Sequence, residues 1–208
     1  MIKFNREVSF PIKDKIINEK IIKLLTKDEI LYNDIAINFE INDISSLANL
    51  RDNSIIFLDK VINLENINSK NIHVVSDIIE NKNFYKNITV VKNLSNSYNT
   101  LLNNLYYHED QLGYIDEYNF INGSYISKYC KINHNAEIGK NCVISRGVEI
   151  GKNSIIKNNV VIKNTIIKNN VIISDNTSLG TTGFGFDFHK RGSIYLNPQI
   201  GIVYIDDN

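Results

Sequence analysis

An apolar residue recurs every six positions through the second half of the chain. The series runs Phe120, Ile126, Ile132, Ile138, Ile144, Ile150, Ile156 and Ile162, and after one step of five residues it resumes at Ile167, Ile173 and Leu179. All 11 positions are apolar although apolar residues make up only 43% of the sequence, so the choice of frame does not explain the run. Because neither an α-helix nor an antiparallel strand has a period of six, the spacing predicts a parallel β-helix from about 120 to 183.

The columns between these apolar positions support the same fold. Four residues after each apolar position stands a small or medium residue that suits an interior corner, and we therefore expect Cys130 and Cys142 to be core residues. The residue just before that corner is often Asn or Gly, as at Asn135, Asn141, Asn153, Asn159, Asn170, Asn176, Gly123 and Gly147. Asn and Gly tolerate the left-handed backbone of a sharp turn. Three hexads are thus predicted to form one triangular coil.

Residues 1–110 lack this repeat and are predicted to form a small α/β domain. Their apolar patterns predict two helices, at 15–25 and 97–107. They also predict strands at 2–10, 35–41, 54–58, 72–75 and 88–91. The polar and acidic stretch 108–118 is predicted to be a linker. We therefore expect a first domain at 1–110 and a β-helical domain at 120–208 that is incomplete at its C-terminal end.

Composition and charge exclude some functions. Lys plus Arg equal Asp plus Glu at 23 each, which argues against binding to nucleic acid or a membrane surface through bulk charge. No apolar run approaches the roughly 18 residues of a membrane span, and the start MIKFNREVSF lacks a signal-peptide core. We expect a cytoplasmic protein that does not span a membrane. The two cysteines predict no disulfide framework, and the histidines of the repeat half are too few for a shared zinc site.

Two motifs follow the point where the hexad series stops. Gly183-Phe184-Gly185-Phe186 comes first, and Pro198-Gln199-Ile200-Gly201 follows a polar loop, after which the apolar pattern restarts at 203–205. The hexads resemble the left-handed β-helix of hexapeptide-repeat transferases. GFGF and PQIG at this spacing are similar to the UDP-3-O-(3-hydroxyacyl)glucosamine N-acyltransferase family, the LpxD family of lipid A biosynthesis. Residues 44–58 look like that family's uridine-binding domain, so the resemblance covers about 34–208.

The resemblance implies a fold, a reaction and partners. The implied fold is an α/β N-terminal domain followed by a left-handed parallel β-helix. The implied reaction moves a 3-hydroxyacyl chain from acyl carrier protein to the 2-amine of UDP-3-O-acylglucosamine, in a homotrimer and without a bound cofactor. Acyl carrier protein and a UDP-sugar are therefore the expected partners, with acetyl-CoA as the alternative acyl donor.

The sequence departs from the family at several places. After the Phe-Leu motif, 59–63 has no Asn and Tyr at the positions where the family has them, and Thr182 stands where Asp commonly precedes GFGF. The family's catalytic His lies in an Ile-x-His-Asn hexad several coils after PQIG, whereas this sequence stops at Asn208. The family's C-terminal helical segment is absent as well. Since a β-helix that stops in mid-coil exposes an unpaired edge, we expect a truncated or split acyltransferase.

Two candidate site residues lie on opposite sides of the predicted linker. His134, in the Ile-Asn-His-Asn hexad at 132–135, has the hexad position of the family's catalytic His. It is a candidate general base because His titrates near neutral pH. The alternative is a surface His of a first coil. Phe57 is the candidate platform for stacking on uracil, and the alternative is a core Phe at a strand end.

The loop between the two motifs supplies the other candidates. Phe184 and Phe186 are candidates for lining an acyl groove or for plugging the end of the β-helix. His189, Lys190 and Arg191 are candidates for contacts with a nucleotide diphosphate or an acidic carrier, against the alternative of a solvated basic loop.

Three other interpretations remain open. The chain could be a different hexapeptide-repeat sugar acetyltransferase that uses acetyl-CoA. It could be a catalytically inactive scaffold subunit, or one half of a split gene whose downstream frame carries the Ile-x-His-Asn hexad. Substrate mass, an intact paralogue and the downstream DNA would distinguish them.

Overall fold

The computed structural model describes residues 9–25, 29–64, 70–107, 116–183, 186–188, 194–196 and 199–207. These residues form two compact units, which we describe separately. One, the sheet unit, comprises Ile12–Tyr107. The other, the coil unit, contains the described residues of Met1–Pro11 and His108–Asn208.

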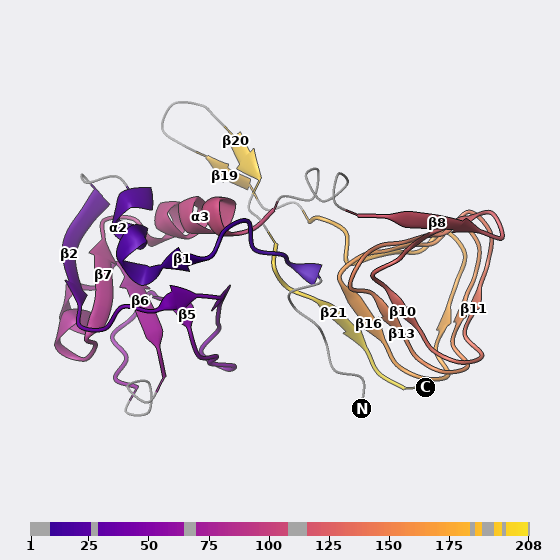
Figure 1. Cartoon of the computed structure of the whole chain (residues 1–208), viewed down its shortest axis with the longest axis horizontal. Helices are drawn as coiled ribbons and strands as arrows, with labels where there is room; N and C mark the ends of the chain where they lie inside the picture. Colours follow the sequence, from indigo (N-terminus) through magenta and orange to yellow (C-terminus); the bar gives the residue numbers. More distant parts are fainter. Residues whose placement is uncertain are drawn as a thin grey trace. The chain divides into compact units, whose positions relative to one another are not determined.

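The coil unit is built of three sheets that run along a triangular prism (Figure 1). The first sheet stacks β10 (Lys131–Ile132), β13 (Glu149–Ile150), β16 (Thr165–Ile167) and β21 (Val203–Ile205). The second stacks β11 (Glu137–Ile138), β14 (Ile155–Ile156) and β17 (Ile172–Ile173). The third stacks β8 (Tyr118–Ile121), β9 (Ser124–Ser127), β12 (Val143–Ile144), β15 (Val161–Ile162) and β18 (Ser178–Leu179).

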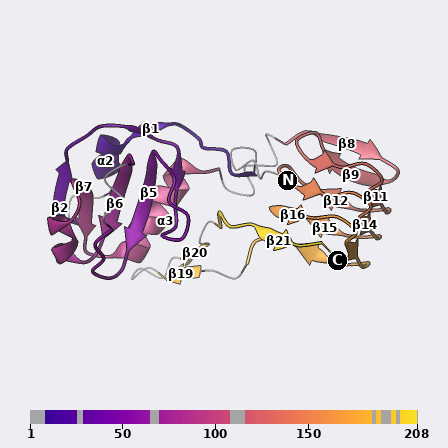
Figure 2. The ribbon, with the colours of Figure 1, turned by 90° about the horizontal axis from the view of Figure 1, so that it is seen from below.

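The hexad register is the one that the apolar spacing predicts. Figure 2 shows β9, β12 and β15 one below another, and their pairing is parallel. Ile126, Ile144 and Ile162 are partners in successive coils of that sheet and point into one core. Every Asn or Gly that the sequence places at a turn has a positive φ, from 56° at Asn153 to 82° at Gly123. The predicted parallel β-helix is confirmed as a stack of parallel coils.

The first coil differs from the prediction. Phe120 is not an interior residue: it lies in β8, pairs antiparallel with Tyr125 and is 67% exposed. The cause is local, because Asn122 and Gly123 both have positive φ and form the two-residue turn that closes an antiparallel hairpin between β8 and β9. The parallel coils therefore begin at Ile126 rather than at Phe120.

The coils resume after the two motifs. The chain leaves the prism after β18, pairs β19 (Phe186–Phe188) with β20 (Ile194–Leu196) as an antiparallel hairpin, and returns as β21. Strand β21 pairs parallel with β16, so that Ile205 lies beside Ile167 in the first sheet. The predicted restart of the hexad pattern at 203–205 is thus confirmed.

The sheet unit contains a five-stranded sheet of order β2-β7-β6-β5-β4. Its strands are β2 (Ile30–Ile35), β4 (Asp43–Ile44), β5 (Ser54–Leu58), β6 (Ile72–Ser76) and β7 (Asn87–Val91), of which β2 alone runs antiparallel to its neighbour. A short pair joins β1 (Ile16–Ile17) to β3 (Glu40–Ile41). The helical segments are η1 (Asn18–Lys20), α2 (Ile21–Leu24), η4 (Ile79–Asn83) and α3 (Leu94–Leu105).

Most predicted elements of this unit are found, with shifted ends. Strand β5 has the predicted bounds, and β6 and β7 each gain one residue. Helix α3 begins three residues early, at Leu94, because the Asn93 side chain accepts a hydrogen bond from the Asn96 N–H and caps it. The helix predicted at 15–25 is confirmed in part, since Asn18–Leu24 is helical as a 3-10 turn followed by α2, whereas Ile16–Ile17 form β1. Of the strand predicted at 2–10, residues 2–8 lie outside the described residues, as do 108–115 of the predicted linker.

The strand predicted at 35–41 is also wrong. Strand β2 ends at Ile35 and β3 starts only at Glu40. Between them, the Asn18 side chain donates to the Ile37 carbonyl and accepts from the Phe39 N–H, at 2.9 and 3.1 Å. Buried Asn18 thereby takes over the hydrogen bonds that a strand partner would make.

Candidate functional site

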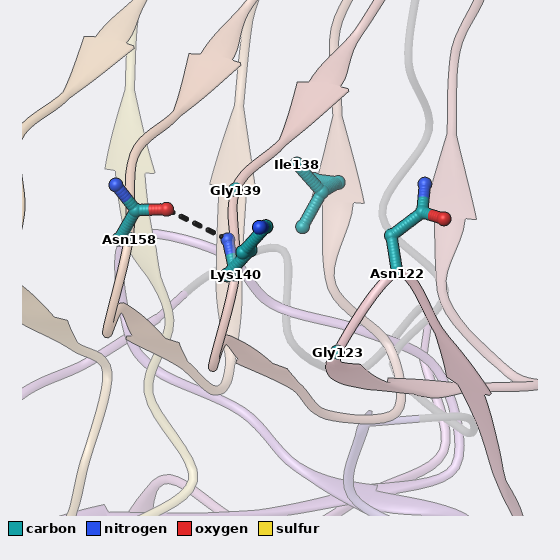
Figure 3. A pocket seen from close by; sticks show the side chains of 6 residues that line it. All are labelled: Asn122, Gly123, Ile138, Gly139, Lys140 and Asn158. Atoms are coloured by element: carbon teal, nitrogen blue, oxygen red, sulfur yellow. Dashed lines mark hydrogen bonds between the residues drawn. The ribbon is translucent and has the colours of Figure 1, made fainter.

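A hollow opens at the corner between the second and third sheets, beside the first two coils. It encloses about 680 Å³ and is open to solvent. Figure 3 shows Lys140 between Asn158 on one side and Asn122 on the other. The lining residues are Asn122, Gly123, Ile138, Gly139, Lys140 and Asn158.

Repeated hydrogen bonds between coils shape this corner. The Lys140 backbone N–H donates to Asn158 Oδ1 over 2.8 Å, and one coil later the Asn158 N–H donates to Asp175 Oδ1 over 2.8 Å. That bond from the Asn158 backbone lowers the pKa of the Asp175 carboxyl, so the carboxylate is the form that caps the corner. Gly139 lies so close to the next coil that a Cβ there would be 2.7 Å from the Lys157 carbonyl carbon.

The side chains that line the hollow suit ligand binding rather than catalysis. It presents one ammonium group, from Lys140, and the carboxamides of Asn122 and Asn158. Its lining contains no Ser, Thr, Cys, His, Asp or Glu, so it offers neither a nucleophile nor a general base of the usual kinds. Donor groups without an opposing carboxylate suit an anionic ligand.

His134 lies at a different corner, between β10 and β11, and is exposed. Its backbone carbonyl accepts a hydrogen bond from Asn153 over 3.4 Å. It thus has the predicted place on the outside of a first-coil turn. It does not line the hollow, and its role as a general base stays a prediction.

Phe57 lies near the end of β5 and is half-buried. Its ring meets the ring of Tyr98 from α3 edge to face, with centroids 4.9 Å apart. The loop after it is held by buried Asn81, whose amide donates to the Lys60 carbonyl over 3.0 Å and whose Oδ1 accepts from Ile62 N–H over 3.2 Å. The ring is therefore fixed on one side, and uracil stacking remains a prediction.

The sequence of the coil unit also matches a known family. Residues 122–152 and 130–164 match the family model of the bacterial transferase hexapeptide (six repeats). Hexapeptide repeats imply a left-handed β-helix and are generally found in transferases, so the match supports this superfamily and acyl or acetyl transfer in general. No curated protein matches the chain.

The remaining candidates lie in the loop between the hexapeptide coils. Phe184, His189, Lys190 and Arg191 lie outside the described residues. Phe186 is described only as the backbone of β19, where it is the partner of Leu196. Their predicted roles thus stay predictions.

Both cysteines pack in the core of the hexapeptide coils, as predicted. Cys142 is buried with its Sγ 3.0 Å from the Lys157 carbonyl oxygen. Burial raises the pKa of the Cys130 thiol to about 11, so it is not a thiolate at neutral pH. Among the described residues no group of three His, Cys, Asp or Glu side chains could hold a metal ion. None of the helices in the described part of the chain has the length and hydropathy to cross a bilayer.

Sequence reasoning missed two buried ionisable groups. Burial raises the pKa of the Glu149 carboxyl, although Lys131 and Lys168 act in the opposite direction. Burial also lowers the pKa of His73 to about 3, so this side chain is neutral in the folded sheet unit at physiological pH. His73 Nε2 lies 2.9 Å from Thr89 Oγ1, a partner that no sequence motif indicates.

Proposed function

We propose that this chain is an N-acyltransferase of lipid A biosynthesis, which moves a 3-hydroxyacyl chain from acyl carrier protein to UDP-3-O-acylglucosamine. One observation carries the proposal. The two motifs that resemble this family, GFGF and PQIG, meet where the hairpin leaves and rejoins the coils: a Cβ on Gly183 would lie 3.0 Å from Gln199 Nε2. The two motifs are separated by a polar loop in the sequence, yet they lie next to each other where the β19–β20 hairpin begins and ends.

The proposed reaction needs few groups from the protein. The acceptor amine forms a bond with the thioester carbonyl carbon, the carbon–sulfur bond breaks, and the amine proton passes through a general base to the departing thiolate, which is released as the carrier's thiol. His134 is the proposed base because its imidazole is exposed at a coil corner. A homotrimer and a cytoplasmic location belong to the same proposal.

A mass-spectrometric assay tests the reaction. The purified chain is mixed with UDP-3-O-acylglucosamine and either 3-hydroxyacyl carrier protein or acetyl-CoA. We expect a product heavier by one hydroxyacyl group with the carrier and none with acetyl-CoA. Product from acetyl-CoA alone would favour the acetyltransferase alternative. Absence of product with both donors contradicts acyl transfer and leaves an inactive scaffold.

The His134→Ala variant tests the base separately. Loss of general base catalysis should lower the rate by about 100-fold or more while binding of the acceptor is unchanged. A variant with the full rate would exclude His134 as the base and leave the reaction itself standing.

The acceptor site is tested by binding. Phe57→Leu keeps an apolar group against Tyr98 and removes the aromatic face, so it should weaken binding of UDP about tenfold if uracil stacks there. Isothermal titration of both proteins with UDP measures the difference. Equal affinities would show that Phe57 is only a packing residue.

A further inference from the structure

Two corners of the hexapeptide coils share one tripeptide. Gly-Lys-Asn occurs at 139–141 and again at 151–153. At both, the lysine backbone N–H donates to an Asn side chain in the next coil: Lys140 to Asn158 over 2.8 Å and Lys152 to Asn169 over 2.9 Å. The following Asn has a φ of 57° at one and 56° at the other. The two lysines therefore have nearly the same backbone setting.

What precedes each corner in the stack is different. Before Lys152 stands the turn that carries His134, whose carbonyl accepts from the Asn153 N–H, just as the Gly123 carbonyl accepts from the Asn141 N–H at the other corner. Before Lys140 stands the hairpin turn Asn122–Gly123. Gly123 has no side chain, and nothing lies within 4 Å of where its Cβ would be. The hollow exists beside Lys140 because the turn leaves this space unfilled.

The donors around the hollow are available for a ligand. Within the part of the chain that the structure describes, neither the Lys140 ammonium nor the Asn122 carboxamide has a hydrogen-bond or ion-pair partner. Asp175 is the acidic residue at the same corner, one coil after Asn158. Its carboxylate already accepts hydrogen bonds from the Asn158 backbone N–H at 2.8 Å and from the Asn158 side-chain amide at 3.2 Å. The lining thus combines an uncompensated positive charge with a second donor.

We propose that this hollow is a subsite for a phosphate group, which accepts hydrogen bonds from the Lys140 ammonium and the Asn122 carboxamide. A compact ammonium group is a common phosphate ligand, and charge-assisted hydrogen bonds are the strong ones. The site itself does not depend on acyl transfer. Only the source of the phosphate rests on the proposed function, in which both the UDP-sugar and the carrier's prosthetic arm carry phosphate esters.

NMR titration of the whole chain with pyrophosphate tests the site. The amide signals of Gly123 and Gly139 should shift on saturation, whereas that of Gly151, in the matched corner, should not. Lys140→Ala should weaken binding about fivefold, and Lys152→Ala, which removes the same charge, should leave it unchanged. Asn122→Asp tolerates the positive φ and adds a negative charge, so it should weaken binding as well.

The outcomes distinguish a specific phosphate site from nonspecific attraction between an anion and the lysines of the chain. Equal losses in Lys140→Ala and Lys152→Ala, or no shift at Gly123 and Gly139, would overturn the proposal. Titration with UDP and with phosphopantetheine-bearing carrier protein then identifies the source, since the true source should lose affinity in Lys140→Ala. Phosphate binding with no acyl product would reject the proposed reaction and keep the subsite.

Discussion

The coil unit and the sheet unit hold their chains in shape by different means. In the coils the same contact returns with each turn of the prism: Lys140 to Asn158, Lys152 to Asn169, and Asn169 to Asp207. Each is a backbone N–H that donates to an Asx side chain one coil later. A defect in one such contact leaves equivalent contacts in the neighbouring coils, as expected of repeat architectures.

The sheet unit depends instead on contacts that occur once. Asn81 ties η4 to the loop after β5 and also donates to Ser76 Oγ over 2.9 Å. Asp43 forms an ion pair with Arg51 Nε at 2.8 Å and accepts from the Tyr106 hydroxyl. Removing one of these groups leaves several buried partners unpaired at once. The loss of one contact is therefore shared among neighbouring coils in the coil unit, whereas it falls on one cluster of buried groups in the sheet unit.

The largest expected effect comes from protonating His73 in the sheet unit. Burial lowers its pKa from 6.5 to about 3, so the unfolded chain binds the proton more tightly than the folded one. Its contribution to stability is therefore complete above pH 6.5 and is lost as the pH falls toward 3. The cost is about 1.4 kcal/mol for each pH unit, or about 3 kcal/mol by pH 4.

Urea unfolding followed by NMR signals of the sheet unit measures this slope. Because carboxylates also titrate in this range, the comparison is between the native chain and His73→Gln, which cannot take up the proton. The difference in unfolding free energy between the two should shrink as the pH is lowered. A difference that stays constant from pH 7 to 4 would contradict the assignment.

A slightly smaller effect is expected from Asn81→Ala. This change leaves the Lys60 carbonyl, the Ile62 N–H and Ser76 Oγ without the partner that Asn81 provides, which should cost about 2 to 3 kcal/mol. Asn83→Ala, on the exposed side of the same η4 turn, is the matched control and should stay within about 0.5 kcal/mol. Chemical denaturation compares them, and equal stabilities would mean that the sheet unit is not held by this residue.

This contrast also explains how far the sequence predicts the structure. In the coils, column positions determine the strands and the turns, because every coil repeats one solution. The five-residue step is absorbed in the turn before β16, where Asn164 has a φ of 43°, so that Ile166 and Ile167 keep their register with β13 and β21. In the sheet unit, strands β5 to β7 follow from their apolar runs. The roles of Asn18 and Asn81 could not be predicted, because the backbone groups that they bond lie 19 or more residues away.

The candidate site was harder to predict than the fold. His134 and Phe57 follow from motif resemblance alone, and their roles stay predictions. The hollow beside Lys140 was missed because its tripeptide is identical to that at 151–153. What distinguishes the two corners is the preceding coil, and the Asn-Gly pair at 122–123 is the signal that could have indicated a hairpin there.

Close stacking of the coils gives the next prediction. A Cβ on Gly151 would lie 2.3 Å from the carbonyl carbon of Lys168, which is backbone and cannot turn away. Gly151→Ala should therefore force adjacent coils apart and cost about 2 kcal/mol. Gly201→Ala, where nothing lies within 4 Å of the added carbon, is the control and should be close to neutral. Calorimetric unfolding of the two variants should rank them in this order, and a neutral Gly151→Ala would mean that the coil spacing is less tight.

The smallest expected effect comes from replacing Asn residues that have a positive φ. It distinguishes the stability due to their backbone conformation from that due to their side-chain hydrogen bonds. Asn159 in the coils and Asn53 in the sheet unit have φ values of 57° and 55°. Replacement by Ala at either should cost about 1 kcal/mol or more, since a Cβ disfavours this region. Gly should restore most of the stability at Asn159, whose side-chain bond to Asn176 spans 3.3 Å at the exposed corner. At Asn53 it should restore less, because the half-buried Oδ1 accepts from Asn71 over 2.8 Å and that bond is lost. Denaturant midpoints of the four variants measure both differences, and equal rescue by Gly would mean that Asn53 serves only its turn, as the repeated Asn residues of the coils do.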